Sequence, residues 1–183
     1  LARFQPQWQH VGSKLRGVDG VAEVLTALQG ASLPASVLES DILPSRIPDY
    51  RPSDLDTLLT AGEIVWAGAG SLGAGDGRVR LVFRDQAPLL LPEPVDPPEG
   101  PVHDAIRECL AQRGAVFWND LVVAAQEAEV DYGETVVLTA LWDMVWAGEV
   151  TNDALTPLRA VVSGATPKKT SGGRTGRAGR RPN

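Results

Sequence analysis

The stretch LDTLLTAGEI at Leu55–Ile64 recurs as LWDMVWAGEV at Leu141–Val150. Leu, Ala, Gly and Glu stand at the same places in both copies, and the apolar positions repeat at helical spacing. Each copy describes a helix that ends at a glycine, followed two residues later by an apolar residue that can enter a strand. We interpret the copies as the third helix and first wing strand of a winged-helix domain, present twice along the chain.

Patterns around the first copy complete one such domain. Three amphipathic segments precede two short apolar segments of strand character, which is the winged-helix order. The first predicted helix is Gly20–Leu28, the second starts at Pro34 and stops at Pro44, and the third ends at Ala61. Two strands are predicted at Glu63–Ala67 and Arg78–Arg84, and they flank a glycine-rich loop.

The second half repeats the plan with less of a wing. Helices are predicted at His103–Gln112, Asp120–Glu129 and Tyr132–Ala147, and Glu149–Asn152 is predicted to enter a strand. The fold class is therefore mainly α with small β-hairpin wings, in tandem winged-helix domains. The predicted divisions are a helix from a preceding element at 1–16, module 1 at 17–87, a proline-rich linker at 88–101, module 2 at 102–163 and a disordered basic tail at 164–183.

Composition agrees with a globular protein. The 183 residues are 43% hydrophobic and 22% charged, and no apolar run reaches the ~20 residues of a membrane span, so no membrane partner is expected. Cys109 is the one cysteine, which favours a cytoplasmic location, and His10 and His103 have no clustered partners that would indicate a metal site. The chain starts at Leu1 and its one methionine is Met144, so we expect a piece of a larger protein.

Charge is distributed unevenly along the chain. All 23 acidic residues precede Ser163, and six of the 17 basic residues follow it, so the body carries −12 and the last 20 residues carry +6. A body this acidic does not bind nucleic acid over a broad face, and any contact must come from local basic groups. The tail is interpreted as a solvated linker, with loose phosphate contacts as the alternative.

Five segments carry a resemblance to a known family. They resemble the C-terminal region of the bacterial large helicase-related proteins (Lhr), and together they span nearly all of residues 1–162. The segments are RFQPQWQ at Arg3–Gln9, GVAEVLTALQG at Gly20–Gly30, LPASVLESDILPSRIPDYRPSDLD at Leu33–Asp56, GEIVWAGAG at Gly62–Gly70 and WDMVWAGEVTNDALTPLRA at Trp142–Ala160.

The resemblance implies a superfamily 2 ATP-dependent DNA helicase or translocase of DNA repair, whose motor domains precede a series of winged helices. It also implies a likeness to winged-helix DNA glycosylases. ATP and Mg²⁺ are then expected in the parent's motor domains and no cofactor in this segment, which has no GxxxxGK[ST] phosphate loop. The parent is expected to be an ATP hydrolase, and this segment alone is not expected to be an enzyme.

Cationic side chains on the wing are the candidate nucleic-acid contact. Arg78, Arg80 and Arg84 are separated by even numbers of residues, which would place all three on one face of a strand beside the glycine-rich tip. Trp66 could stack on a base, although packing under the wing explains it as well. The alternative for the arginines is a solvated outer face that balances nearby carboxylates.

Both predicted third helices lack the basic face of a DNA-reading helix. The first offers Ser53, Asp54 and Asp56 to solvent, and the second is apolar on two sides. The extra apolar side of the second predicts a contact with a neighbouring domain or subunit. Its residues are Leu138, Trp142 and Trp146.

No catalytic residue is predicted. The polar candidates have structural explanations as a helix face, a cap or a turn; they are Gln5, Gln7, Asn119–Asp120 and Asn152–Asp153. The expected function is a non-catalytic scaffold and auxiliary, sequence-nonspecific DNA contact of an Lhr-type helicase. The alternatives are an oligomerisation or docking module without DNA contact, and a segment of a glycosylase-like array.

Overall fold

The structure, a computed structural model, describes residues 14–73, 75–94, 96–128 and 133–164. The helix predicted within 1–16 and the basic tail predicted at 164–183 lie almost entirely outside the described residues. Across the described ranges, no helix combines the length and the apolar character that crossing a membrane requires.

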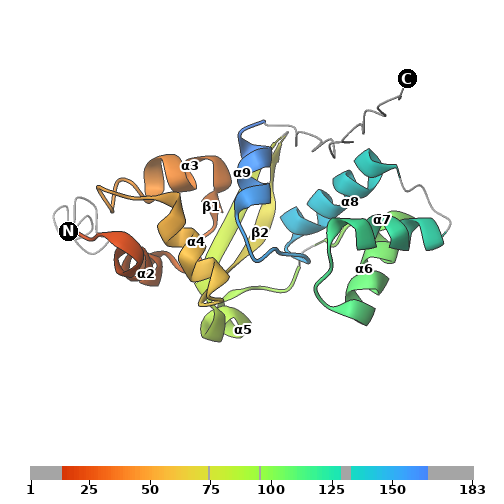
Figure 1. Cartoon of the computed structure of the whole chain (residues 1–183), viewed down its shortest axis with the longest axis horizontal. Helices are drawn as coiled ribbons and strands as arrows, with labels where there is room; N and C mark the ends of the chain where they lie inside the picture. Colours follow the sequence, from red (N-terminus) through yellow and green to blue (C-terminus); the bar gives the residue numbers. More distant parts are fainter. Residues whose placement is uncertain (1–13, 74, 95, 129–132, 165–183) are drawn as a thin grey trace, which may run out of the picture.

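The first half of the chain forms a winged helix (Figure 1). Three helical segments pack on one face of an antiparallel sheet with strand order β1-β3-β2, and the three helices and the hairpin follow the predicted order. We call this part the winged unit and its β2–β3 hairpin the wing. Its elements are α2 (Gly17–Leu28), β1 (Leu33–Pro34), α3 (Ala35–Val37), the π-helical turn η1 (Leu38–Ile42), α4 (Pro52–Thr60), β2 (Ile64–Gly73) and β3 (Asp76–Phe83).

The sheet is larger than predicted in two ways. Leu33 and Pro34 pair with Val79 and Arg78 of β3, where the sequence indicated only the start of a helix. Proline has no amide hydrogen to continue a ladder, so this strand stays short and at the edge. The wing strands also extend through most of the predicted glycine-rich loop, to Gly73 and from Asp76.

Both copies of the sequence repeat end their helix in the same way. Gly62 and Gly148 adopt the left-handed backbone, with φ of +70° and +82°. A pair of amide-to-carbonyl hydrogen bonds of the Schellman type closes each helix. The bonds run from Gly62 to Leu59 and from Glu63 to Leu58 in the first copy, and from Gly148 to Val145 and from Glu149 to Met144 in the second.

The second half contains a bundle of three helices, which we call the three-helix unit. Its own core is built from one apolar stripe on each helix and includes Ile106, Ala125, Val137 and Met144. A short 3₁₀ turn and helix lead into it from the wing. These elements are η2 (Arg84–Gln86), α5 (Ala87–Leu90), α6 (Pro101–Arg113), α7 (Trp118–Glu127) and α8 (Glu134–Ala147).

The second wing predicted from the sequence is wrong for the described residues. Glu149–Asn152 forms no strand, and the chain continues into the helix α9 (Thr156–Val162). The reason lies in where α8 ends: Val150 packs against both apolar clusters, and the hydroxyl of Thr151 donates a hydrogen bond to the Trp66 carbonyl of β2. The segment after α8 therefore runs across to the winged unit instead of turning back on its own bundle.

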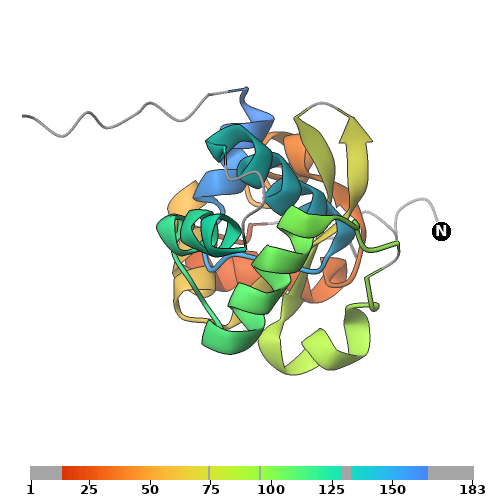
Figure 2. The ribbon, with the colours of Figure 1, turned by 90° about the vertical axis from the view of Figure 1, so that its right-hand side faces the viewer.

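The core of the winged unit is completed by the C-terminal part of the chain. Figure 1 shows α9 beside α4 and the sheet, and the perpendicular view in Figure 2 shows the helices of the second half in front of the winged unit. Four C-terminal residues are buried in that core: Val145, Trp146, Leu155 and Leu158. The two units therefore share apolar packing and are not independent domains joined only by a linker.

Two glycines of the wing let the end of α8 approach the sheet. A Cβ at Gly68 would lie 1.8 Å from the Val145 carbonyl oxygen, and a Cβ at Gly77 would lie 2.4 Å from the Trp146 ring. Neither distance is possible for real atoms, and the obstacle at Gly68 is backbone that cannot rotate away. These two positions have to be glycine for the units to be packed as they are.

Alanine at Gly77 should therefore destabilise the chain by about 3 kcal/mol, at the upper end of the usual cost of overpacking. In a Trp146→Val background the same Gly77→Ala change should cost less than about 1 kcal/mol, because the obstructing ring is gone. Urea unfolding of the four variants measures both values. Equal costs in the two backgrounds would show that the ring contact does not exist.

Candidate nucleic-acid interface

Arg78 and Arg80 lie on the face of β3 that points away from the core. They alternate with Val79 and Leu81, which are buried in the winged unit, so the pleat turns both guanidinium groups outward. Arg78 is exposed and Arg80 is half-buried. Within the part of the chain that the structure describes, neither side chain has an ion-pair or hydrogen-bond partner, so their donors are available to phosphate.

Arg84 does not belong to this face, which corrects the prediction of three arginines on one strand. β3 ends at Phe83, and Arg84 begins the 3₁₀ turn η2. Its Nε donates a hydrogen bond of 2.6 Å to the Gly62 carbonyl, and its guanidinium covers that glycine. Arg84 thus fastens the turn between α4 and β2 to the base of the wing, and the cationic face has two members.

Trp66 cannot stack on a base, which corrects the second part of the predicted contact. Its side chain is 1% exposed and lies on the core face of the sheet, directly paired with Leu81. Its indole Nε1 has no hydrogen-bond partner among the described residues. The alternation of side chains along a strand predicts that Trp66 and Ile64 lie on the same face of the sheet. It does not predict which of the two faces the helices cover.

The wing is held in place from several sides. The Asp76 carboxylate accepts hydrogen bonds from the Ser36 amide (3.2 Å), the Ser36 hydroxyl (2.6 Å) and the Gly77 amide (2.8 Å). Burial disfavours the charged form of Asp76, but these donors outweigh it, and the pKa of the carboxyl lies below its ordinary value. On the other side, the wing rests against Trp146 at the end of α8.

The third helix of the winged unit, α4, is joined to α9 by an arginine. Arg159 of α9 donates to both carboxylate oxygens of Asp56 on α4 (2.8 and 3.0 Å) and to both of Glu39 on η1 (2.6 and 3.0 Å). The hydrogen bonds to Glu39 raise the pKa of the guanidinium above its ordinary value, against the effect of burial and with further support from Asp56. One side of α4 is therefore engaged by α9, while Ser53, Thr57 and Thr60 stay exposed.

Tyr50 extends this cluster of charged groups. Its hydroxyl donates a 2.5 Å hydrogen bond to Glu39, and burial followed by the Glu39 carboxylate raises the pKa of the phenol. Sequence reasoning missed the cluster, because its members are up to 120 residues apart and no local pattern connects Glu39 with Arg159.

Trp142 and Trp146 lie between the two units of this chain. Their ring centroids are 5.3 Å apart, Trp146 is 9% exposed in the core of the winged unit, and Trp142 packs against that core from outside. Leu138, the third residue predicted at an interface, is half-buried and belongs to neither apolar cluster. The side of α8 that carries the two tryptophans is thus covered from within the chain.

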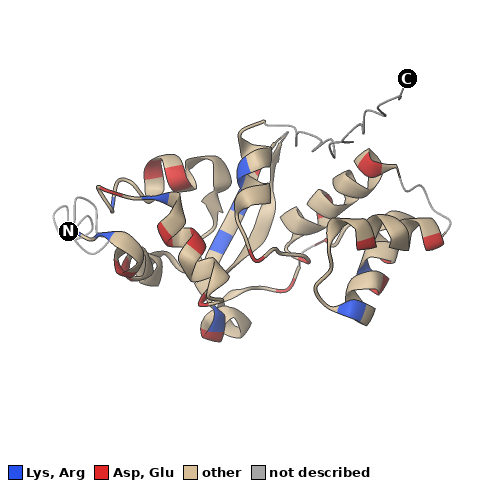
Figure 3. Ribbon diagram, viewed as in Figure 1, with Lys and Arg blue, Asp and Glu red and all other residues tan. Residues whose placement is uncertain are grey.

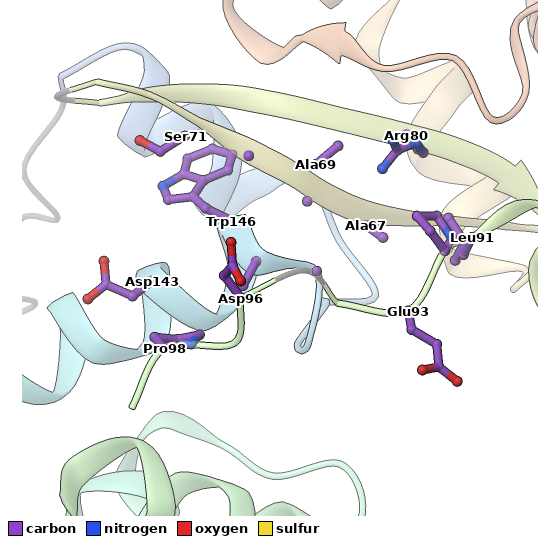
Figure 4. Close-up of a pocket in the computed structure, with 15 residues that line it drawn as sticks. Ala67, Ala69, Ser71, Arg80, Leu91, Glu93, Asp96, Pro98, Asp143 and Trp146 are labelled. Carbon is purple, nitrogen blue, oxygen red and sulfur yellow. The ribbon is translucent and has the colours of Figure 1, made fainter. Parts of the chain in front are cut away.

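A cavity of about 560 Å³ lies beside the wing, between β2, the end of α8 and the segment that follows α5. Arg80 lines one end, near Leu91, and Asp143 and Trp146 line the other (Figure 4). Three carboxylates line the cavity against one arginine, because Glu93 and Asp96 also face it. Acidic residues are distributed over helices of both units as well (Figure 3).

The sequence of the chain is similar to those of named proteins. The winged-helix domain of the large helicase-related protein, as a family model, matches residues 1–84. The Lhr helicase/probable uracil glycosylase of Mycolicibacterium smegmatis is 44% identical over 164 residues, which are 89% of this chain and 11% of that protein. The Lhr helicase/uracil glycosylase of Escherichia coli K12 is 39% identical over 170 residues, 90% of this chain and again 11% of the relative.

Loss of the Asp76 charge should loosen the wing in acid. Because the pKa of Asp76 is lowered by folding, its contribution to stability is complete above the unfolded value of about 3.9 and disappears as the pH falls through the lower folded pKa. Urea unfolding of the wild type and Asp76→Asn should therefore show a wild-type advantage at pH 6 that shrinks as the pH is lowered below about 4. An advantage that stays constant over this range would contradict the assignment.

Proposed function

Because the chain belongs to the large helicase-related (Lhr) family, we propose that it is a non-catalytic winged-helix segment of an ATP-dependent DNA helicase that acts in DNA repair. It works as a scaffold, and its wing adds a sequence-nonspecific contact to DNA. The motor that binds ATP and Mg²⁺ lies elsewhere in the longer protein, since this chain spans 11% of the length of its curated relatives.

The shared core supports the scaffold role. A segment that only linked two domains would leave each with its own core, whereas here Leu155 and Leu158 of α9 complete the core of the winged unit. The Arg159 cluster adds polar contacts across the same joint. Packing of this kind fixes the direction in which the chain leaves each unit, and so fixes the position of the wing relative to its neighbours.

The observation that carries the DNA contact is the pair of unpartnered arginines, Arg78 and Arg80, side by side on the outer face of β3. Guanidinium groups bind phosphate oxygens with paired donors and read no sequence in doing so. The usual reading helix offers no alternative, because α4 is acidic and engaged by Arg159. Contact through the wing alone therefore predicts salt-sensitive and nonspecific binding.

Replacing both arginines by alanine should weaken DNA binding and reduce its salt dependence. Each lost phosphate contact lowers the slope of log K against log salt by about 0.9, so the double variant should lose nearly two. Fluorescence anisotropy with the full chain measures the slope, and contributions from the basic tail are the same in every variant. Arg113→Ala is the matched control, since Arg113 is already paired with Asp120 in the three-helix unit.

An unchanged slope in the double variant would leave a docking module without DNA contact as the better description. The oligomerisation alternative is tested in the same samples by light scattering. A concentration-dependent mass that is lost on changing Trp142 would support it.

A second candidate is a segment of a DNA glycosylase. Two observations favour it: both relatives are named as uracil glycosylases, and the cavity beside the wing holds Asp143 and Trp146. The test is uracil release from single-stranded DNA by the purified chain, with Asp143→Asn for comparison. On the scaffold proposal neither protein releases uracil; release that is lost with the Asn variant would establish the glycosylase instead.

A further inference from the structure

The wing ends in an exposed leucine. Leu72 is 46% exposed near the tip of the hairpin and belongs to neither apolar cluster. The residues on both sides are small, and the pairing with β3 is irregular between Gly68 and Ser71 and again between Ser71 and Gly73. Irregularities of this kind turn a strand and re-aim its side chains.

Two glycines make this protrusion possible. Gly70 and Gly73 have φ values of +108° and +118°, a backbone that side-chain-bearing residues rarely adopt, and open space surrounds both. The backbone on either side of Leu72 therefore takes a shape that a regular strand cannot, with no bulky neighbour to cover the leucine. Figures 1 and 2 both place this tip at the far end of the wing from α5.

We propose that Leu72 is a wedge that enters the base stack of DNA held by the wing. This inference rests on the proposed DNA contact and adds what the wing does to its ligand. In minor-groove and architectural DNA-binding proteins, leucine is one of the few side chains that separate adjacent bases, and it kinks the duplex as it enters.

The spacing of the wing fits this action. Ser71 pairs with Gly77 and Gly73 with Asp76, so Leu72 lies between one and two residues, or roughly 5 Å, beyond Arg78 along the hairpin. That length equals about one to two steps of 3.4 Å along one DNA strand. Arginine contacts to phosphates can therefore coexist with a leucine between bases one or two steps away.

The wing is also held in place by contacts with the rest of the protein. Asp76 ties the start of β3 to Ser36, and Gly77 rests on the Trp146 ring. Closer to the tip, a Cβ at Gly75 would lie 3.4 Å from the Val161 carbonyl of α9. These contacts hold the β3 side of the hairpin against the body of the protein.

DNA is a better occupant for Leu72 than a protein surface. Protein docking sites bury a cluster of large side chains, whereas the neighbours of Leu72 are glycine and serine. Arg78 and Arg80 on the same hairpin have no partner within the described residues, and their positive charge suits phosphate. The favoured substrate is DNA with a weakened step, such as a mismatch or a junction of single and double strands, because unstacking costs least there.

The experiment compares the full chain with Leu72→Ala, Leu72→Met and Leu89→Ala on duplexes that carry 2-aminopurine next to a mismatch or in a matched context. The wild type should raise the 2-aminopurine fluorescence of the mismatched duplex and prefer it by about 10-fold, the scale of a weakened stack. Leu72→Ala should lose the fluorescence rise and the preference yet keep the salt slope. Leu72→Met should retain both, and so should Leu89→Ala, an exposed leucine (81%) on α5 at the opposite end of the wing.

The two proposals fail in different ways. Normal fluorescence and preference in Leu72→Ala, with binding still weakened in the Arg78/Arg80 double variant, would overturn the wedge and leave the phosphate contact in place. An unchanged salt slope in the double variant would overturn the DNA contact itself. Loss of self-association in Leu72→Ala, seen by light scattering without any change on DNA, would assign Leu72 to protein docking and also overturn the wedge.

Discussion

The arrangement of the molecule depends on how closely the end of α8 approaches the wing. At Gly68 and Gly77 the absence of a side chain lets helix backbone and an indole ring occupy space that any other residue would fill. Once α8 stops there, Val150 and Thr151 are already at the sheet, and the chain reaches α9 without leaving the surface of the winged unit. The shared core and the position of Arg159 are consequences of this contact.

The same contact sets the charge of the helices around it. By leading the chain back to the winged unit, it places Arg159 against Asp56 on α4 and Glu39 on η1. Other cations form pairs of this kind; Arg107, for example, bonds both Asp104 and Glu149. Among the described residues Arg78 and Arg80 have no such partner, and the proposed DNA contact depends on that.

Much of this could be predicted from local pattern. The winged-helix order, the glycine stops of α4 and α8 and the likeness to Lhr proteins are confirmed, since helical periodicity and left-handed glycines act over a few residues. The wing was foreseen, but its length was not, because glycines that indicate a loop can also continue a strand with bulges. Leu72 carried a visible signal, an apolar residue between Ser71 and Gly73 in a glycine-rich stretch, and was passed over.

What failed did so for a common reason. Arg84 and the second wing were placed by extending a period or a repeat, and each depended on which surface another segment would occupy. For Trp66, base stacking is excluded and the alternative of packing under the wing is confirmed. The sequence by itself determined where helices start and stop, which residues alternate along a strand and how acidic the body is, because these follow from neighbours in the chain. The tertiary structure alone decided that the second wing gives way to α9, that Trp66 faces inward and that Arg84 leaves the outer face of β3, because burial, hydrogen bonding and ion pairing join residues that are far apart in the chain.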